Sequence, residues 1–130
     1  SGEVALALSA ENSVLVCDPM HIYNVINNLI DNAIKYSPDK LMLTIRTENQ
    51  QNGLLVSIVD QGLGMNKEQQ HRIFENFYRI PTGNLHDVKG FGLGLSYVQK
   101  MIEAHRGNVW VESELGVGST FHIWLPILDS

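Results

Sequence analysis

Four asparagines lie on the polar face of a stretch that has the periodicity of an amphipathic helix, from Met20 to Tyr36. They are Asn24, Asn27, Asn28 and Asn32. Asparagine costs roughly half a kcal/mol of helix stability relative to alanine, because its side chain competes for backbone hydrogen bonds. A face that only meets water would more often carry Glu, Lys, Gln and Arg. The composition therefore predicts a use for neutral amide oxygens, with an ordinary solvated face as the simpler alternative.

A carboxylate and two glycines follow the apolar run from Leu54 to Val59, in the segment 60–64 (Asp-Gln-Gly-Leu-Gly). A strand end would hold the carboxylate of Asp60 rigidly, and glycines let the backbone approach a flat ligand without a Cβ clash. Because a carboxylate accepts a hydrogen bond from an exocyclic amine, adenine is a natural ligand. A simple strand-to-helix turn would explain the segment equally well.

A second glycine-rich segment, 89–95 (Lys-Gly-Phe-Gly-Leu-Gly-Leu), leads directly into a predicted helix. Free N–H groups and the positive end of the helix dipole meet at such a start, where an anion can bind. No strand immediately precedes the segment and no Gly-Lys-Ser/Thr follows it, which excludes a Rossmann site and a P-loop. Arg79 precedes the non-periodic segment 80–89 and could bind phosphate with its two-pronged guanidinium. Phosphate binding by another architecture is the favoured interpretation.

The composition is that of one soluble globular domain of 130 residues, with 44% apolar and 18% charged residues. No apolar run approaches the roughly 18 residues of a membrane span, and no signal peptide is recognisable. The net charge of −5 argues against sequence-independent binding to nucleic acid. The single cysteine, Cys17, excludes an internal disulfide bond and fits a reducing compartment.

Turn and capping residues predict the first elements. One or two short strands are expected between Glu3 and Cys17. Asp18-Pro19 then opens the asparagine-rich helix, which Ser37-Pro38 ends. The alternation from Leu41 to Thr47 and the apolar run before Asp60 predict an antiparallel hairpin.

Two further helices and a second hairpin complete the expected fold. Asn66 and Gln69 have the types and spacing of a capping box at the start of the second helix. The third helix is expected over about residues 92–105, with Gly107 in the left-handed position that often follows a helix. Apolar alternation on both sides of the turn 116–118 predicts two closing strands. Three helices and about five or six mostly antiparallel strands predict an α+β two-layer sandwich, with the helices on one face of the sheet.

The order of these motifs resembles that of the catalytic ATP-binding domain of sensor histidine kinases, in the superfamily that includes gyrase-type and mismatch-repair ATPases. Segment 28–36 is similar to the N box of that family, and segments 60–64 and 90–95 are similar to its G1 and G2 boxes. Segment 74–77 resembles the F box, and segment 116–121 resembles the final glycine turn. The resemblance covers residues 14–126. It implies the Bergerat fold: a two-layer sandwich with a mixed sheet of about five strands, three main helices on one face and a flexible ATP lid at about 78–90.

The resemblance also implies a role for individual residues. Asp60 would accept the hydrogen bond of the adenine amine. The other residues expected to line the base pocket are Gly62, Gly64 and the turn from Gly118 to Thr120. Asn32, with Asn28 close by, would bind Mg²⁺ through amide oxygens, which suits the preference of this ion for oxygen ligands. The remaining residues expected to bind the nucleotide are Lys35, Tyr36, Arg79, Lys89, Gly90, Gly92, Gly94 and Leu95.

Three of these residues, Asn28, Lys35 and Arg79, are expected to take part in catalysis. Members of the superfamily that hydrolyse ATP carry a water-activating glutamate on the first helix, where this sequence has Asn28. Because an amide is no general base, the resemblance favours phosphoryl transfer to a protein acceptor over hydrolysis. The acceptor of the family is a histidine followed closely by an acidic residue. Here only His86 is immediately followed by one, and it falls in the expected lid.

The function implied is therefore transfer of the γ-phosphoryl group of Mg-ATP to a histidine, in two-component signal transduction. The partner would be a dimerisation and phosphoacceptor hairpin upstream of Ser1 in the same parent protein, and indirectly the receiver domain of a response regulator. The domain alone is expected to be monomeric and cytoplasmic, whether or not its dimeric parent is anchored in a membrane. Two alternatives stay open: an anti-sigma-type serine kinase of the same fold, and a non-catalytic nucleotide-sensing module.

Overall fold

Five strands form one mixed sheet in the computed structural model, which describes residues 2–8, 19–35, 41–75 and 94–126. The strands are β1 (Gly2–Leu8), β2 (Leu41–Gln50), β3 (Gly53–Asp60), β4 (Asn108–Glu114) and β5 (Gly118–Pro126). They lie in the order β1-β2-β3-β5-β4, with β1 parallel to β2 and the other three pairs antiparallel. The helices are α1 (Pro19–Lys35), α2 (Lys67–Arg72) and α3 (Gly94–Ala104). The expected mixed, mostly antiparallel sheet is confirmed.

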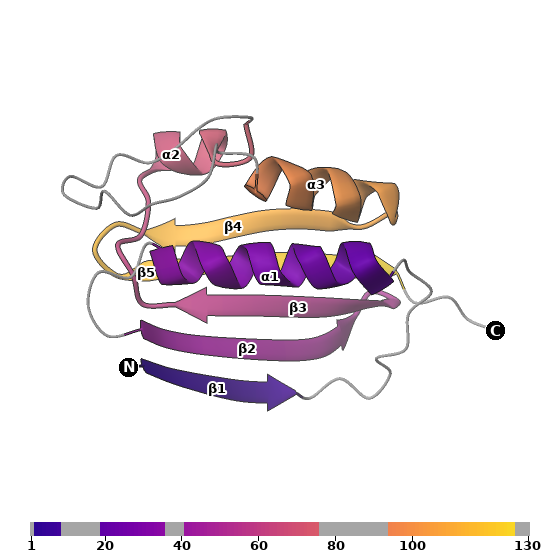
Figure 1. Ribbon diagram of the computed structural model, residues 1–130, viewed down its shortest axis with the longest axis horizontal. Helices are drawn as coiled ribbons and strands as arrows, with labels where there is room; N and C mark the ends of the chain where they lie inside the picture. The colour runs from indigo at the N-terminus through magenta and orange to yellow at the C-terminus, as the bar shows by residue number, and fades with distance from the viewer. Residues whose placement is uncertain (1, 9–18, 36–40, 76–93, 127–130) are drawn as a thin grey trace.

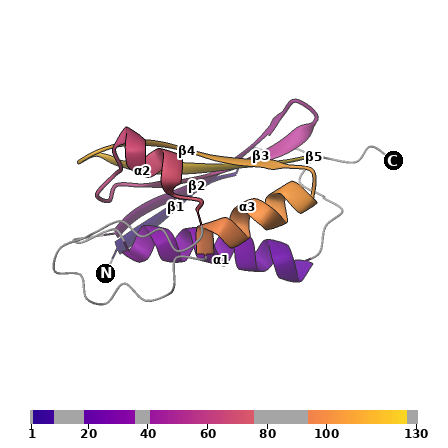
Figure 2. The same ribbon diagram turned by 90° about the horizontal axis from the view of Figure 1, so that it is seen from above.

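The long helices α1 and α3 lie side by side and cover one face of the sheet (Figures 1 and 2). Their apolar side chains meet those of β3 and β5. The largest fully buried side chains are Val25, Leu29, Ile58, Val98, Ile102, Phe121 and Ile123. The short helix α2 lies beside β4. The ring of Phe74, which follows α2 in the sequence, contacts the ring of Phe121 edge-on, with centroids 6.3 Å apart. The expected α+β two-layer sandwich is confirmed.

The pairing register decides which residues meet at the strand ends. Gln51 and Asn52, with φ of 52° and 61°, form the two-residue turn between β2 and β3, a backbone geometry that matches the twist of a hairpin. β3 then pairs with β5 so that Asp60 lies opposite Ser119. Because alternate residues of a strand point to opposite faces, Asp60 shares the helix-covered face with the buried Ile58.

The start of α2 follows the expected capping box. The backbone N–H of Gln69 donates to Oδ1 of Asn66 at 2.8 Å, and Oε1 of Gln69 accepts from the N–H of Asn66 at 2.9 Å. Two backbone donors that a helix start leaves without partners are thereby satisfied. The capping box therefore fixes where α2 begins, and with it the end of the segment 61–65 that follows β3.

The end of α3 differs from the expectation by one residue. Arg106, with φ of 65°, occupies the left-handed position, and Gly107 does not have a positive φ. The N–H of Arg106 donates to the carbonyl of Glu103 at 3.0 Å, and that of Gly107 donates to the carbonyl of Ile102 at 2.9 Å. These two bonds define a Schellman motif. Gly107 is required for another reason, because a Cβ on it would lie 2.2 Å from the carbonyl oxygen of Trp124.

Some expected features lie outside the described residues. Among them are the segment 9–18 with Cys17, the lid at 78–90 and Phe77. β1 begins one residue before the region 3–17 in which one or two strands were expected, and the expected beginning of the third helix before Gly94 is not described. None of the helices in the described ranges is long and apolar enough to cross a membrane.

Replacing Arg106 with glycine is expected to raise the free energy of unfolding by about 0.5–1 kcal/mol, because glycine adopts a positive φ without steric cost. Gly107→Ala is expected to lower it, since the added Cβ has no space. Urea denaturation measures both changes. Lys100→Gly, at an exposed position inside α3, is the control and should cost about 1 kcal/mol. A loss of stability in Arg106→Gly would contradict the assigned helix end.

Candidate nucleotide-binding site

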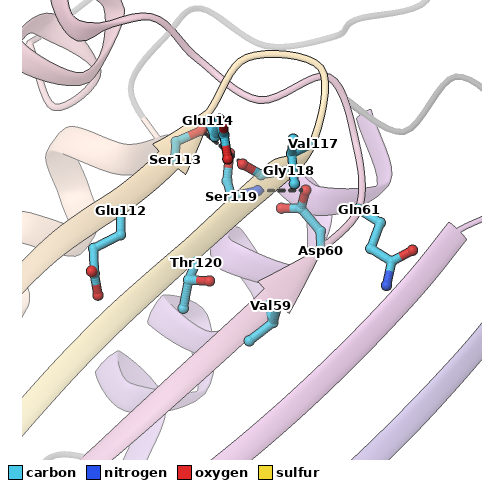
Figure 3. A pocket seen from close by; sticks show the side chains of 10 residues that line it. All are labelled: Val59, Asp60, Gln61, Glu112, Ser113, Glu114, Val117, Gly118, Ser119 and Thr120. Carbon is cyan, nitrogen blue, oxygen red and sulfur yellow. Dashed lines mark hydrogen bonds between the residues drawn. The ribbon is translucent and has the colours of Figure 1, made fainter.

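Asp60, the last residue of β3, carries a buried carboxylate that is only 7% exposed. Its Oδ1 accepts hydrogen bonds from the backbone N–H of Gly62 at 2.9 Å and of Ser119 at 3.3 Å, the second of which is drawn in Figure 3. Oδ2 accepts no hydrogen bond from the described residues. The strand end and two backbone donors therefore fix the carboxylate, and one of its oxygens keeps its lone pairs for another donor.

The burial of Asp60 has an electrostatic consequence. Desolvation raises the pKa of this carboxyl group above its usual value, and the hydrogen bonds from Gly62 and Ser119 oppose part of the rise. A carboxylate held against such a cost is a feature of functional sites more often than of structural ones. It is the one ionisable side chain among the buried residues of the described chain.

Close backbone packing holds the segment after Asp60 against the turn between β4 and β5. The N–H of Gly116 donates to the carbonyl of Leu63 at 2.7 Å. Gly64 has a φ of 70°, and a Cβ on it would lie 2.0 Å from the carbonyl oxygen of Glu114. A Cβ on Gly118 would lie 2.2 Å from the carbonyl oxygen of Asp60. Two of the glycines are thus required by the approach of a second backbone, a reason that the sequence motif alone did not reveal.

Ser119, and not Thr120, is the neighbour of Asp60. Thr120 lies opposite Val59 in the register, so its side chain is on the face of the sheet that the helices leave uncovered. Figure 3 shows Thr120 beside Val59 and pointing away from the Asp60 carboxylate. The sequence predicts that the turn 118–120 lines the base pocket, and within that turn Ser119 is the residue whose N–H donates to Asp60. The register between β3 and β5 makes this choice, because residues paired across two strands share a face.

A hollow with a volume of about 540 Å³ borders the ends of β3, β4 and β5 (Figure 3). Its lining includes Asp60 and Ser119, but also Val59, Glu112 and Thr120. Those last three belong by alternation to the uncovered face of the sheet. The hollow therefore extends along the face opposite to α1 and α3, away from the asparagine-rich helix.

Asn28 on α1 meets the beginning of α3. Its Nδ2 donates to the carbonyl of Asn24 at 2.9 Å. Its Oδ1 is turned to α3, since a Cβ on Gly94 would lie 3.1 Å from that oxygen. The side chain of Asn24 in turn donates to the hydroxyl of Tyr97 at 3.5 Å. The structure thus brings the N-box and G2-box segments together and orients an amide oxygen at their junction.

The structure describes only some of the other expected site residues. Asn32 is partly buried on α1, at the i+4 position from Asn28. Leu95 is buried in the core, and Lys35 ends α1, where its side chain is not described. Those outside the described residues are Tyr36, Arg79, Lys89, Gly90 and Gly92.

Metal ligands of the usual ionisable types do not gather in the described ranges. No group of three or more His, Cys, Asp or Glu side chains there could hold a metal ion. An ion at the α1–α3 junction would therefore depend on amide oxygens and on oxygens of its own ligand. Mg²⁺ fits such a donor set, because it takes oxygen ligands and often only one or two of them from protein.

Comparison with known proteins identifies the family. Residues 17–129 match the model described as "Histidine kinase-, DNA gyrase B-, and HSP90-like ATPase". Since the match takes in most of the chain, the chain belongs to this family of ATPase domains. Its relatives include adaptive-response sensory kinases and the sensor histidine kinase WalK of Bacillus subtilis, and its structural neighbours include a sensor histidine kinase, so within the family it is of the histidine kinase type.

Two relatives support this narrower class. Sensor protein RprX of Bacteroides fragilis (strain YCH46) is 52% identical over 132 residues, covering 100% of this chain and 25% of RprX. Adaptive-response sensory kinase SasA of Synechococcus elongatus is 40% identical over 114 residues, covering 87% of this chain and 29% of SasA. The chain therefore spans only 25–29% of the length of these two relatives.

Solved structures, among them that of a sensor histidine kinase, share the fold. The mycobacterial sensor histidine kinase MprB superposes with a TM-score of 0.81 at 26% identity, over 95% of this chain and 83% of that one. Full-length ShkA in complex with AMPPNP superposes with a TM-score of 0.83 at 26% identity, over 98% of this chain and 26% of that one.

The Asp60→Asn substitution is expected to change how stability depends on pH. Because burial raises the pKa of Asp60 in the folded protein, the carboxyl group favours folding most when it is protonated. That contribution is lost as pH rises from the unfolded-state value of 3.8 through the raised folded-state pKa. The free energy of unfolding of the wild type should therefore fall, relative to that of Asp60→Asn, between acidic and neutral pH.

Chemical denaturation at a series of pH values measures this difference. Asp31→Asn, at an exposed position of α1, is the matched control for the loss of one negative charge. A difference between wild type and Asp60→Asn that stays constant or grows in favour of the wild type with rising pH would contradict the effect of burial.

Proposed function

We propose that this domain binds Mg-ATP and donates the γ-phosphoryl group to a histidine on a separate phosphoacceptor domain. The observation that carries the proposal is the geometry of Asp60, whose Oδ1 is saturated by two backbone donors while Oδ2 stays available. Membership of the ATPase family and the AMPPNP complex of ShkA support the choice of nucleotide.

At the base end, Asp60 accepts the hydrogen bond of the adenine amino group through Oδ2. The buried setting strengthens such a bond and makes a mispaired carbonyl costly, so the site favours adenine over a base with an oxygen at the same position. Gly62 and Gly64 keep the wall of the pocket free of side chains. Of the turn 118–120, which is proposed to line the base pocket with Thr120 at its end, Ser119 is the residue paired with Asp60.

At the phosphate end, Asn28 and Asn32 supply amide oxygens for Mg²⁺. The bond from Nδ2 of Asn28 to the carbonyl of Asn24 fixes which atom of the amide faces the junction with Gly94. When bound, Mg²⁺ neutralises charge on the phosphate oxygens. The other residues proposed to contact phosphates or ribose are Lys35, Tyr36, Arg79, Lys89, Gly90, Gly92 and Leu95.

The transfer itself needs little covalent chemistry from this chain. A nitrogen of the acceptor imidazole attacks the γ-phosphorus, the P–N bond forms as the bond to the bridging oxygen breaks, and ADP leaves with the electron pair while the imidazole N–H proton is released. Catalysis of such a step is mostly positioning and neutralisation of charge, the roles proposed for Asn28, Lys35 and Arg79. Asn28 is a poor base for activating water, so transfer is favoured over hydrolysis.

The proposed partner is a helical hairpin of the same parent protein, which would carry the acceptor histidine and hold the parent as a dimer. The long remainder of the relatives is consistent with such a neighbour, since the chain covers only 25% of RprX. The receiver domain of a response regulator would take the phosphoryl group next. In this proposal the domain lies on the cytoplasmic side of any membrane that anchors the parent. Residues 78–90 are proposed as the lid over the nucleotide.

Calorimetric titration with AMPPNP and Mg²⁺ is expected to show saturable binding, and Asp60→Asn should weaken it by about 2–3 kcal/mol. In the variant, the amide oxygen must stay with the N–H groups of Gly62 and Ser119, so the amide NH₂ necessarily faces the amino group of adenine. Asn28→Ala should reduce the gain in affinity that Mg²⁺ gives. Asn27→Ala, exposed on the same helix, is the control and should change neither value. Undiminished affinity in Asp60→Asn would remove the assigned role of this carboxylate.

Labelled ATP tests the transfer step. The domain alone is expected to remain unlabelled, because it lacks the acceptor, whereas the parent protein extended upstream should gain an acid-labile, base-stable phosphohistidine. Phosphate analysis after acid and base treatment distinguishes the classes. An acid-stable label on a partner protein would favour the serine kinase, and intact ATP binding without any label would favour the nucleotide-sensing module.

A further inference from the structure

The hydroxyl group of Ser113 on β4 lies at the centre of a small hydrogen-bond network beside Asp60. Its Oγ accepts from the backbone N–H of Met65 at 2.8 Å. The same oxygen lies 2.9 Å from the carbonyl oxygen of Gly118 and 2.8 Å from Oγ of Ser119. Ser113 is half-buried and Ser119 is buried, so these three contacts are largely removed from water.

The number of protons in the network fixes the direction of each bond. The Met65 N–H is a donor, so Ser113 accepts there. The Gly118 carbonyl has no proton, so the single proton of Ser113 goes to it. The contact between the two hydroxyl groups therefore needs the proton of Ser119. Ser119 therefore donates its single hydroxyl proton to Ser113. The Oγ atom of Ser119 then has only lone pairs to offer to another group.

This direction matters because Ser119 is paired with Asp60. The two residues lie opposite each other in the register, and the N–H of Ser119 donates to Asp60 Oδ1. With Oδ2 of Asp60 available and the proton of Ser119 engaged elsewhere, both side chains present acceptors alone. A pair of acceptors suits an amino group and repels a carbonyl group.

We propose that Ser113 is a positioning residue that sets the base specificity of the site, by holding Ser119 as a hydrogen-bond acceptor beside Asp60. This inference rests on the proposed binding of adenine at Asp60. Ser113 acts through Ser119 and does not itself touch the base. Without Ser113, the hydroxyl proton of Ser119 is free to turn to a ligand, and the site gains a donor that accepts a carbonyl in place of the amine.

Gln70 fixes the same network from the α2 side. Its Nε2 donates to the carbonyl of Met65 at 3.0 Å and to the carbonyl of Ser113 at 3.1 Å. Both hydrogens of the amide are therefore used to join the segment after β3 to β4. The backbone of Ser113 is held independently of its hydroxyl group, so removing that hydroxyl is expected to change the direction of the bonds more than the position of the strands.

The test compares binding of ATP with that of ITP, which carries a carbonyl oxygen where adenine carries its amino group. Calorimetry on the whole domain with Mg²⁺ gives the ratio of the two affinities for the wild type, Ser113→Ala, Ser113→Cys and Ser113→Thr. Ser113→Ala is expected to weaken the binding of ATP and to strengthen the binding of ITP or leave it unchanged. The ratio of ATP affinity to ITP affinity should therefore fall about tenfold or more. Ser113→Thr keeps the hydroxyl group and should retain the wild-type ratio.

A matched control separates this effect from a general loss of stability. Ser57→Ala removes another buried serine hydroxyl, hydrogen-bonded to His122 at 2.8 Å on the uncovered face, and should leave the ratio unchanged. Thermal unfolding of each variant confirms that it is folded. If Ser113→Ala does not fold, the near-isosteric Ser113→Cys decides, since its weak thiol should also lower the ratio.

The outcomes distinguish this inference from the proposed function. Equal weakening of ATP and ITP in the Ser113 variants, with Asp60→Asn still losing ATP, would overturn the role of Ser113 and leave adenine binding intact. If the wild type does not bind ATP, or if Asp60→Asn leaves the affinity for ATP unchanged, the proposed function would be overturned as well. A ratio that falls in Ser113→Ala and returns in Ser113→Thr would support the inference.

Discussion

The contact between the segment after β3 and the turn after β4 is the constraint on which the site depends. The bond from Gly116 N–H to the Leu63 carbonyl, at 2.7 Å, joins two loops that are distant in the sequence. Gly64 and Gly118 leave no room for a Cβ at this contact, so any other residue would separate the loops. Ser119 follows Gly118 directly and is paired with Asp60 across β3 and β5, so the strand pairing beside this contact also orients the carboxylate.

Local signals in the sequence were sufficient for most of the fold. The asparagine-rich helix, the β2–β3 hairpin and the capping box of Asn66 and Gln69 depend on residues within a few positions of one another, and the structure has all three. Such features follow from periodicity, turn propensity and capping, which act along the chain. The segments that form the core could therefore be found without knowledge of their partners in space.

Features that depend on two distant segments could not be found in this way. Whether Ser119 or Thr120 faces Asp60 is decided by the register between β3 and β5, and a shift of one residue exchanges the two faces. Gly107 was correctly expected to matter, but the reason is the carbonyl of Trp124 on another strand, while Arg106 takes the left-handed position. The role of Ser113 requires its contacts on three other segments.

The site also departs from local stability rules at two separate places. Asparagines on α1 cost helix stability, and the buried carboxylate of Asp60 costs solvation energy. Neither cost is offset by the core, since the asparagines lie on the polar side of α1 and Oδ2 of Asp60 has no donor among the described residues. Departures of this kind are expected where a ligand supplies the missing interactions. An amine would donate the missing hydrogen bond to Oδ2 of Asp60, and a cation would bind the amide oxygens of α1. A nucleotide bound with its metal ion carries both groups.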